Sequence, residues 1–460
     1  MLRSPVSLNR RNSSIPQSGV PWSARTDEVR ERDGSGRGLG GRKRRQPARA
    51  LLAGAVSLGL TCSGCGLVPG SKTPQPVTSL VSSGPARTLP AAAAAASAAA
   101  AASAAGAASA AASCVAQVFS RMNEAQRVGQ LFLIGIAGAP AGEVAQAVGT
   151  YHFGSLLFEG TSTAGVAADR QVTQAIQSLA SSAATARVRF FIAANQEGGQ
   201  VQELQGPGFS EIPSALAQGQ LSAADLQRQA AAWGQELRSA GVNLDLAPVM
   251  DVVPSATASQ NAPIGAVQRE FGHNPETTGA HGVAFIRAMK QAGVATTAKH
   301  FPGLGQVVGN TDFTSGVVDT TTGPKNPYLK SFQAAIKAGV AFVMIALATY
   351  TRIDPHHLAA FSSRIMRGLL RGQLRFRGVI VSDDLGAAAA VAGLSPATRG
   401  IDFLAAGGDL ITSQSLPAAI AMDQAILARA ADDAAFRSTV NSAVMRVLDA
   451  KQAYHLMPCR

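Results

Sequence analysis

Cysteine and charge are both scarce in this chain. The 460 residues include four cysteines, Cys62, Cys65, Cys114 and Cys459. Their number and spacing exclude a disulfide-dense small scaffold and a four-thiolate zinc ribbon. Charged residues make up 15% of the chain and aromatic residues 5%, whereas hydrophobic residues reach 46%. That hydrophobic fraction is enough for a large buried core, and it excludes a wholly disordered protein.

The sequence lacks the short motifs of several enzyme classes. It has no GxSxG nucleophile elbow, no HExxH zinc motif and no pair of CxxC motifs. The glycine pattern of Gly36, Gly38 and Gly41 follows no predicted strand, so we reject it as a dinucleotide-binding loop. No metal or cofactor is therefore expected.

The net charge of +12 is concentrated at one end of the chain. Residues 1–50 contain twelve Arg and Lys but four Asp and Glu, which leaves +4 for the other 410 residues. A surface that follows nucleic-acid phosphates would place its basic charge in the folded region. We therefore expect no nucleic-acid partner.

Residues 1–65 are predicted to be an N-terminal extension and a secretory signal. Arg and Lys residues at 42–45 lead into the apolar run LLAGAVSLGL and then Cys62-Ser63-Gly64-Cys65. This apolar run is too short to span a bilayer stably. The ending resembles a bacterial lipoprotein signal, which predicts lipidation of Cys65, although Cys62 stands where Leu is usual. The alternative is an ordinary secretory signal. We expect an exported protein, either a cell-membrane lipoprotein facing the cell wall or a secreted protein.

Residues 66–113 are predicted to be a linker, because they are rich in Pro, Ser and Thr and then almost pure Ala. Residues 114–460 are the expected folded domain. Cys114 and Cys459 stand at its two ends, and in an exported protein they are expected to form a disulfide. Two free thiols are the alternative.

The folded domain alternates strands and helices eight times. Helical patterns, such as those at 222–241, 275–293 and 416–450, separate eight apolar runs at 130–136, 153–159, 188–195, 243–252, 294–303, 338–347, 378–385 and 407–413. Eight such units predict an α/β fold, a closed (β/α)8 TIM barrel, with a doubly wound open sheet as the alternative. Reactive residues of a barrel follow its strands, and five polar residues do so: Asn195, Asp251, Lys299, His300 and Asp383.

Five segments together resemble glycoside hydrolase family 3. They are KHFPGLG at 299–305, SDDL at 382–385, NQEGG at 195–199, NLDLAPVMD at 243–251, and IG with REFG between 264 and 272. The resemblance extends over 115–457. It implies a single-domain bacterial β-N-acetylhexosaminidase of the retaining type. The printed sequence ends directly after the barrel, without the second α/β domain of many family β-glucosidases, and this also favours the hexosaminidase branch.

Retaining glycoside hydrolysis needs a carboxylate nucleophile and a second group that donates and then accepts a proton. The resemblance assigns the nucleophile to Asp383, whereas Asp384 is expected to point the other way or to cap the next helix. A structural alternative is that both aspartates cap that helix. The resemblance also implies that Arg269, Lys299 and His300 bind sugar hydroxyls. Asn195 and Asp251 are predicted to join them, with Asp251 and Glu197 orienting other side chains.

The sequence departs from the family in three segments. The family's Asp-x-His dyad falls on Asn310-Thr311-Asp312, so Asp312 takes the histidine position and is our candidate acid/base. The alternative is that Asp312 keeps the role of the family Asp in a shifted loop. Asn195 replaces the sugar-binding Asp, and Glu203 stands where the GGRVxR pattern has Arg.

The resulting expectation is a monomeric enzyme that acts on a carbohydrate substrate and touches the membrane only through its lipid anchor. The predicted reaction releases terminal β-linked N-acetylglucosamine from glycans or peptidoglycan fragments. Two alternatives remain open: a β-glucosidase, and a degenerate barrel that binds glycan without turnover.

Overall fold

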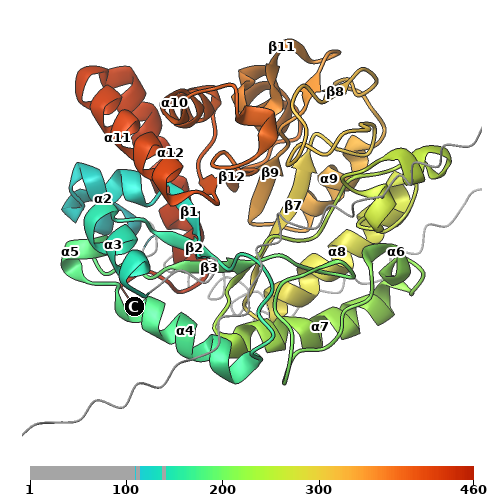
Figure 1. Cartoon of the computed structure of the whole chain (residues 1–460), viewed down its shortest axis with the longest axis horizontal. Helices are drawn as coiled ribbons and strands as arrows, with labels where there is room; N and C mark the ends of the chain where they lie inside the picture. Colours follow the sequence, from blue (N-terminus) through green and yellow to red (C-terminus); the bar gives the residue numbers. More distant parts are fainter. Residues whose placement is uncertain (1–108, 110–113, 137–140, 460) are drawn as a thin grey trace, which may run out of the picture. The chain divides into compact units, whose positions relative to one another are not determined.

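Eight parallel strands form one sheet in the part of the chain that the structure describes (Figure 1). This computed structural model describes residue 109, residues 114–136 and residues 141–459. The predicted signal with Cys65 lies outside these residues, as does almost all of the linker. The strands are β1 (Phe132–Gly135), β2 (Ser155–Leu157), β3 (Phe191–Ala194), β6 (Leu244–Asp245), β7 (Ala295–Phe301), β9 (Phe342–Ile345), β12 (Val379–Ser382) and β13 (Ile411–Ser413).

The sheet curls into a nearly closed barrel. The first and last strands are neighbours, because β1 pairs with β13 with Phe132 opposite Ile411. Between β12 and β13 the barrel is completed by a parallel bridge from Val381 to Leu410. The predicted (β/α)8 barrel is thus confirmed, and the pairing of the first strand with the last excludes an open doubly wound sheet.

One helical segment follows each barrel strand. In chain order these segments are α3 (Ala141–Tyr151), α4 (Val166–Ser178), α7 (Ala223–Ala240), α8 (Pro275–Gln291), α9 (Leu329–Lys337), the π-helical η5 (Arg364–Gln373), α10 (Pro396–Ala406) and α11 (Leu416–Asp432). Two of these helices begin at a side-chain N-cap: the Ser222 and Asn274 side chains accept the backbone N–H groups of Asp225 and Thr277.

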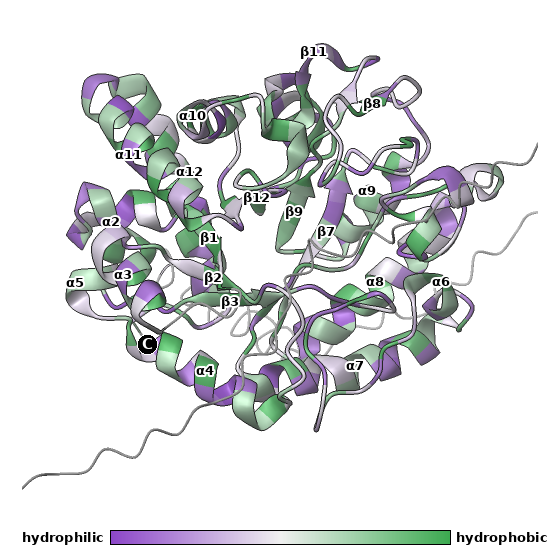
Figure 2. Cartoon of the chain, viewed as in Figure 1, coloured by the Kyte–Doolittle hydropathy of each residue, from purple (hydrophilic) through white to green (hydrophobic). Residues whose placement is uncertain are grey.

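The strands are apolar because both of their faces are covered. Every residue of β9 and β12 is buried, and both strands are hydrophobic in Figure 2. Aromatic rings fill the space between elements: the Phe191 and Phe342 rings meet edge to face at 5.2 Å, and Phe301 meets Phe332 in the same way. Because this core is packed with apolar side chains, polar side chains that could carry chemistry are expected at the strand ends.

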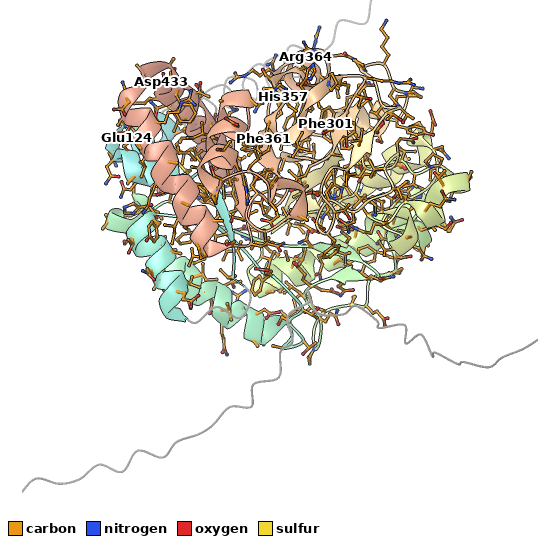
Figure 3. The ribbon with its side chains drawn as sticks, turned by 45° about the horizontal axis from the view of Figure 1, so that its top comes forward. Glu124, Phe301, His357, Phe361, Arg364 and Asp433 are labelled. Carbon is orange, nitrogen blue, oxygen red and sulfur yellow. A yellow bond between two sulfur atoms is a disulfide. The ribbon has the colours of Figure 1, made fainter. Side chains whose placement is uncertain are left out.

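The helical run predicted at 416–450 is two helices rather than one. α11 ends at Asp432 and α12 (Ala434–Ala453) begins two residues later. The residue between them, labelled in Figure 3, is Asp433, whose carboxylate accepts the backbone N–H groups of Ala435 and Phe436. An aspartate in this extended conformation is a strong N-cap, so it starts a new helix instead of continuing the old one.

Shorter elements connect these units. They are α2 (Glu124–Gly129), α5 (Ser182–Thr185), α6 (Ala215–Gln218), β4 (Gln196–Gly198), β5 (Val201–Gln202), β8 (Val318–Asp319), β10 (Thr349–Tyr350), β11 (Asp354–Leu358), η2 (Ser255–Gln260), η3 (Gly265–Val267), η4 (Ala359–Phe361) and η6 (Ala389–Val391). β4 and β5 pair as a small antiparallel hairpin directly after β3, and β8, β10 and β11 form a three-stranded sheet. Among the described helices, none combines the length and hydropathy needed to cross a membrane.

The two ends of the domain are linked covalently. Cys114 and Cys459 form a disulfide whose Cα atoms are 5.9 Å apart and 345 positions apart in the sequence. The C-terminal segment also accepts a hydrogen bond from the residue pair that precedes β3, since the N–H of Arg189 donates to the carbonyl of Leu456 at 2.8 Å. The C-terminal segment that carries Cys459 therefore packs near the start of β3. Asn195 follows the opposite, carboxyl end of that strand.

Candidate active site

The predicted polar residues gather at the carboxyl ends of the barrel strands. Asn195 directly follows β3, Lys299 and His300 lie in the last residues of β7, and Asp383 directly follows β12. β6 is shorter than predicted, because its pairing as a strand ends at Asp245, well before residue 252. The backbone nevertheless continues beside β7, where the N–H of Met250 donates to the carbonyl of Lys299. Asp251 is thereby carried to the same end of the barrel.

Glu197 organises the cationic side of this site. Its carboxylate accepts two hydrogen bonds from Arg269, at 2.7 and 2.8 Å, and Lys299 Nζ lies 2.6 Å from its Oε1. The Glu197 and Lys299 side chains are each 3% exposed. Burial acts to raise the pKa of Glu197, but the charges of Arg269 and Lys299 outweigh it and lower that pKa to about 2. Glu197 is therefore a fixed negative charge that holds the two cations in place.

Asp251 plays the corresponding role for His300. Its Oδ2 lies 2.7 Å from His300 Nδ1, and its Oδ1 accepts the backbone N–H groups of His300 and Leu304 at 3.2 and 2.8 Å. With Asp251 Oδ2 as the acceptor, Nδ1 is the donor of this hydrogen bond. The arrangement fixes both the imidazole and the first turn of the KHFPGLG segment.

Asp383 is partly buried at the end of β12. Its backbone N–H donates to the carbonyl of Ile345, and its Oδ1 accepts the N–H of Asp384 at 3.0 Å. Burial raises the pKa of Asp383 to about 6, and the negative charge of Asp312 adds to this, while His300 and Lys299 act to lower it. Asp383 is thus ionised at neutral pH and faces groups of both signs.

Asp384 has a structural role. Its carboxylate accepts the backbone N–H groups of Gly386, Ala387 and Gln414 at 2.8 to 3.0 Å. Three backbone bonds occupy a carboxylate almost completely, so Asp384 shapes the turn after β12 and the two adjacent aspartates have different surroundings.

Asp312 lies on an exposed loop after β7. The loop is held against the segment after β12, because the carbonyls of Thr311 and Asp312 accept the N–H groups of Ala390 and Ala389 at 3.1 and 3.0 Å. This contact brings the Asp312 carboxylate close enough to raise the pKa of Asp383. A partly buried carboxylate at a strand end therefore faces a more exposed carboxylate on a loop.

Asn195 is bound on both sides. Its Oδ1 accepts a hydrogen bond from Lys299 Nζ at 2.9 Å, and its Nδ2 donates to Glu203 Oε1 at 3.1 Å. The buried Asp245 is a charged neighbour of Glu203 and accepts the N–H of Gln196 at 3.1 Å. Burial raises the pKa of Asp245 to about 7 and that of Glu203 to about 8. Asp245 has no predicted role from the sequence, although an acidic residue inside an apolar strand is a signal of a functional or paired group.

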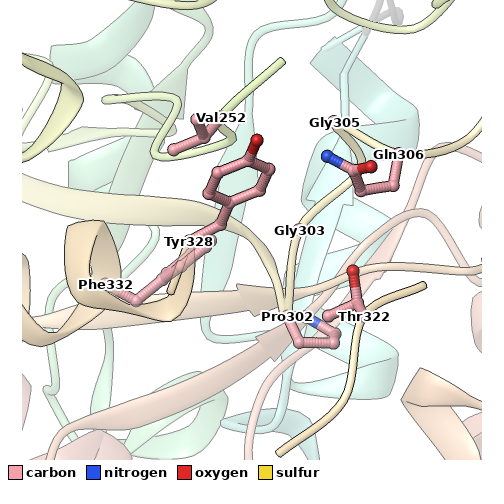
Figure 4. Close-up of a pocket in the computed structure, with 8 residues that line it drawn as sticks. All are labelled: Val252, Pro302, Gly303, Gly305, Gln306, Thr322, Tyr328 and Phe332. Carbon is pink, nitrogen blue, oxygen red and sulfur yellow. The ribbon is translucent and has the colours of Figure 1, made fainter. Parts of the chain in front are cut away.

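A small pocket lies beside the KHFPGLG segment rather than at Asp383. It is lined by Val252, Pro302, Gly303, Gly305, Gln306, Thr322, Tyr328 and Phe332 (Figure 4). Over the described ranges, no group of three or more His, Cys, Asp and Glu side chains is arranged to hold a metal ion.

Known proteins resemble this chain both in sequence and in structure. A "Beta-hexosaminidase" of Stenotrophomonas maltophilia (strain R551-3) is 37% identical over 233 residues, which is 48% of this chain and 65% of that protein, just under two thirds of its length. The crystal structure of a β-N-acetylhexosaminidase from Beutenbergia cavernae DSM 12333 is 47% identical and has a TM-score of 0.70, covering 72% of this chain and 98% of that one.

A third relative is more distant. The structure of a family 3 β-N-acetylglucosaminidase from Paenibacillus sp. str. FPU-7 is 28% identical with a TM-score of 0.65, covering 73% of this chain and 63% of that one. The model of the glycosyl hydrolase family 3 N-terminal domain matches residues 124–450. Since this match takes in every strand and crossover of the barrel, the chain belongs to glycosyl hydrolase family 3.

Proposed function

We propose that this protein is a retaining glycoside hydrolase that releases terminal β-linked N-acetylglucosamine. The observation that carries the proposal is the position of Asp383, which lies at the end of a barrel strand where the charges of His300 and Lys299 and of a second carboxylate, Asp312, all act on its pKa. Relatives described as β-hexosaminidases and β-N-acetylhexosaminidases support the choice of sugar. Terminal sugars of glycans or peptidoglycan fragments are the proposed substrates.

The proposed reaction has two steps. In the first, the Asp383 carboxylate attacks the anomeric carbon, the glycosidic C–O bond breaks, and the leaving oxygen takes a proton from Asp312. In the second, Asp312 takes a proton from water, the water oxygen bonds to the anomeric carbon, and Asp383 is released as a carboxylate. Two displacements at one carbon retain its configuration. Because Asp383 is ionised at neutral pH, it is suited to attack.

The cationic groups are proposed to bind and orient the sugar. Lys299 and Arg269 offer several N–H donors to hydroxyl oxygens, and His300, held by Asp251, offers a fixed imidazole. Asn195 keeps a second amide hydrogen and a second carbonyl lone pair for a hydroxyl group. Positioning of this kind contributes by holding the anomeric carbon in line with Asp383.

The test is hydrolysis of aryl β-N-acetylglucosaminide and aryl β-glucoside by wild type and by Asp383→Ala. The proposal predicts turnover of the first substrate and its loss in the variant. A preference for the glucoside would favour a β-glucosidase. A folded protein that binds glycan and hydrolyses neither substrate would favour a binding barrel, which the replacement of charged family residues by Asn195 and Glu203 motivates.

We further propose that the protein is exported and anchored by a lipid on Cys65. The support is the basic and apolar pattern before that cysteine. Labelling with radioactive palmitate tests the anchor: wild type should incorporate the label and Cys65→Ala should not. Equal labelling of both proteins would exclude Cys65 as the modified residue.

A further inference from the structure

Asn195 and Glu203 are joined at three points. The N–H of Glu203 donates to the carbonyl of Asn195 at 3.1 Å, which closes the base of the β4–β5 hairpin. In the opposite direction, the backbone N–H of Asn195 donates to Glu203 Oε2 at 2.5 Å and its Nδ2 donates to Oε1 at 3.1 Å. Both oxygens of Glu203 are thus used by a single neighbour.

This contact decides which way the Asn195 amide faces. With Nδ2 directed at Glu203, Oδ1 is directed at Lys299, whose Nζ donates to it at 2.9 Å. Lys299 is itself paired with Glu197. A reversed amide would place Nδ2 against the Lys299 ammonium, which is a contact between two donors, and would place Oδ1 against Glu203 Oε1, which is unfavourable once Glu203 ionises above its pKa of about 8. Glu203 therefore helps to fix the orientation of the Asn195 amide, with its oxygen toward Lys299, at the end of β3.

The identities of the two residues depend on each other. An aspartate at position 195 would place an oxygen against Glu203 Oε1, where two carboxyl groups have to share one proton. Asp245 and Lys299 are the other charged neighbours of Glu203. Asp245 raises the pKa of Glu203 and Lys299 lowers it. The family pattern has an acid at 195 and a base at 203, and this chain replaces both with an amide and an acid. Either combination gives one donor and one acceptor, whereas an acid at both positions gives two acceptors.

We propose that Glu203 is a positioning residue of the active site, which orients Asn195 toward Lys299, and that residues 195 and 203 work only as a matched pair. The inference rests on the proposed function, since the pair acts through the sugar-binding side chains. It assigns to Glu203 a role in substrate affinity without contact between Glu203 and substrate.

The test exchanges the two functional groups without adding bulk. The variants are Asn195→Asp, Glu203→Gln and the double variant, with Glu211→Gln, an exposed glutamate beyond the hairpin, as the matched control. In the double variant the glutamine introduced at position 203 can accept the backbone N–H of residue 195 through Oε1 and donate Nε2–H to the new aspartate. We measure kcat and KM for aryl β-N-acetylglucosaminide at pH 7.0 and 8.5, and dissociation constants for N-acetylglucosamine by calorimetry.

Each single variant should raise KM and the dissociation constant by roughly tenfold, the typical effect of one mismatched buried hydrogen bond, with a smaller change in kcat. The rise in Asn195→Asp should be larger at pH 8.5, because the shared proton is lost. The double variant should recover most of the affinity at both pH values, and the control should match wild type.

The inference is overturned if the double variant is no better than the weaker single variant, because the two positions then act independently. The inference also fails if all three variants lose thermal stability and affinity equally and the double variant recovers neither. Glu203 would then have a purely structural role. These failures appear only among the variants. Failure of the proposed function appears in wild type, and a wild type that neither hydrolyses the substrate nor binds the sugar overturns both proposals.

Discussion

Asp251 holds His300 through its side chain and its backbone at once, with Oδ2 2.7 Å from Nδ1 and Oδ1 3.2 Å from the backbone nitrogen. Oδ1 also accepts the N–H of Leu304. Both oxygens of Asp251 accept hydrogen bonds, from three donors in total. An amide has one acceptor oxygen and one donor group, so it cannot accept at both positions. With an amide at position 251, the NH2 group would face a donor in either orientation.

Asp251→Asn should therefore lower kcat/KM by roughly 10- to 100-fold, which corresponds to the loss of one hydrogen bond to a charged group. The measurement is steady-state kinetics with aryl β-N-acetylglucosaminide, accompanied by thermal melting to show that the variant folds. Unchanged kcat/KM in a folded variant would mean that His300 needs no carboxylate for its function.

The acid limb of activity should report the ionisation of Asp383. Burial and the charge of Asp312 raise the pKa of Asp383 to about 6, so this proposed nucleophile gains a proton and loses its activity as the pH falls through that value. Asp312→Asn removes one cause of the shift and should move the limb to lower pH. A 2,4-dinitrophenyl leaving group departs without protonation by an acid. With a 2,4-dinitrophenyl glycoside, the acid limb of the pH profile can therefore be measured in Asp312→Asn from the release of the phenolate in the first step. An unmoved or upward-shifted limb would show that Asp312 does not act on Asp383.

The disulfide should contribute stability and not activity. Cys114 and Cys459 close a loop of almost the entire domain, and loss of such a cross-link costs roughly 2–5 kcal/mol. Cys459→Ser should lower the melting temperature while leaving KM for the aryl substrate within experimental error at 25 °C. Identical melting of the variant and of oxidised wild type would contradict this expectation.

Lys451 should make stability depend on pH. The side chain is fully buried and donates to Gln130 Oε1 and to the carbonyl of Gly154 at 2.7 and 2.6 Å. Burial lowers its pKa to about 7 from 10.5. Between these values the unfolded chain binds the proton and the folded chain does not, so stability should rise with pH from about 7 to 10.5 and lack this contribution below pH 7.

In Lys451→Met this slope should disappear, whatever the variant's absolute stability. The measurement compares melting temperatures at pH 6, 8 and 10 for wild type, Lys451→Met and Lys337→Met, which changes an exposed lysine. Parallel curves for wild type and Lys451→Met would show that the buried amine keeps its proton in the folded state.

The barrel was predictable because its strands are apolar runs that recur at regular intervals. Boundaries were less predictable. The run at 243–252 contains Pro248, which has no N–H to give to a strand ladder, and β6 ends at Asp245. The run at 416–450 has unbroken helical periodicity, and its division depends on the single cap at Asp433.

The site was predictable where residues follow strands, as Asn195 and Asp383 do. Partnerships across the barrel were not, because periodicity and spacing do not encode them: Arg269 meets Glu197 from a loop 72 residues away. Glu203 was seen as a departure from the family, but its pairing with Asn195 depends on the turn of the β4–β5 hairpin, which brings the two residues together only in the folded chain.

The central claim is that Asp383 forms a covalent bond to the sugar. The most direct measurement is mass spectrometry of peptides after incubation with 5-fluoro-N-acetylglucosaminyl fluoride, whose good leaving group allows the first step and whose second fluorine slows the release. We predict one added 5-fluoro-N-acetylglucosaminyl group on the peptide that contains Asp383, with Asp402→Asn labelled as in wild type and Asp383→Ala unlabelled. Label on a different carboxylate, or turnover of the fluoride by Asp383→Ala, would contradict the account.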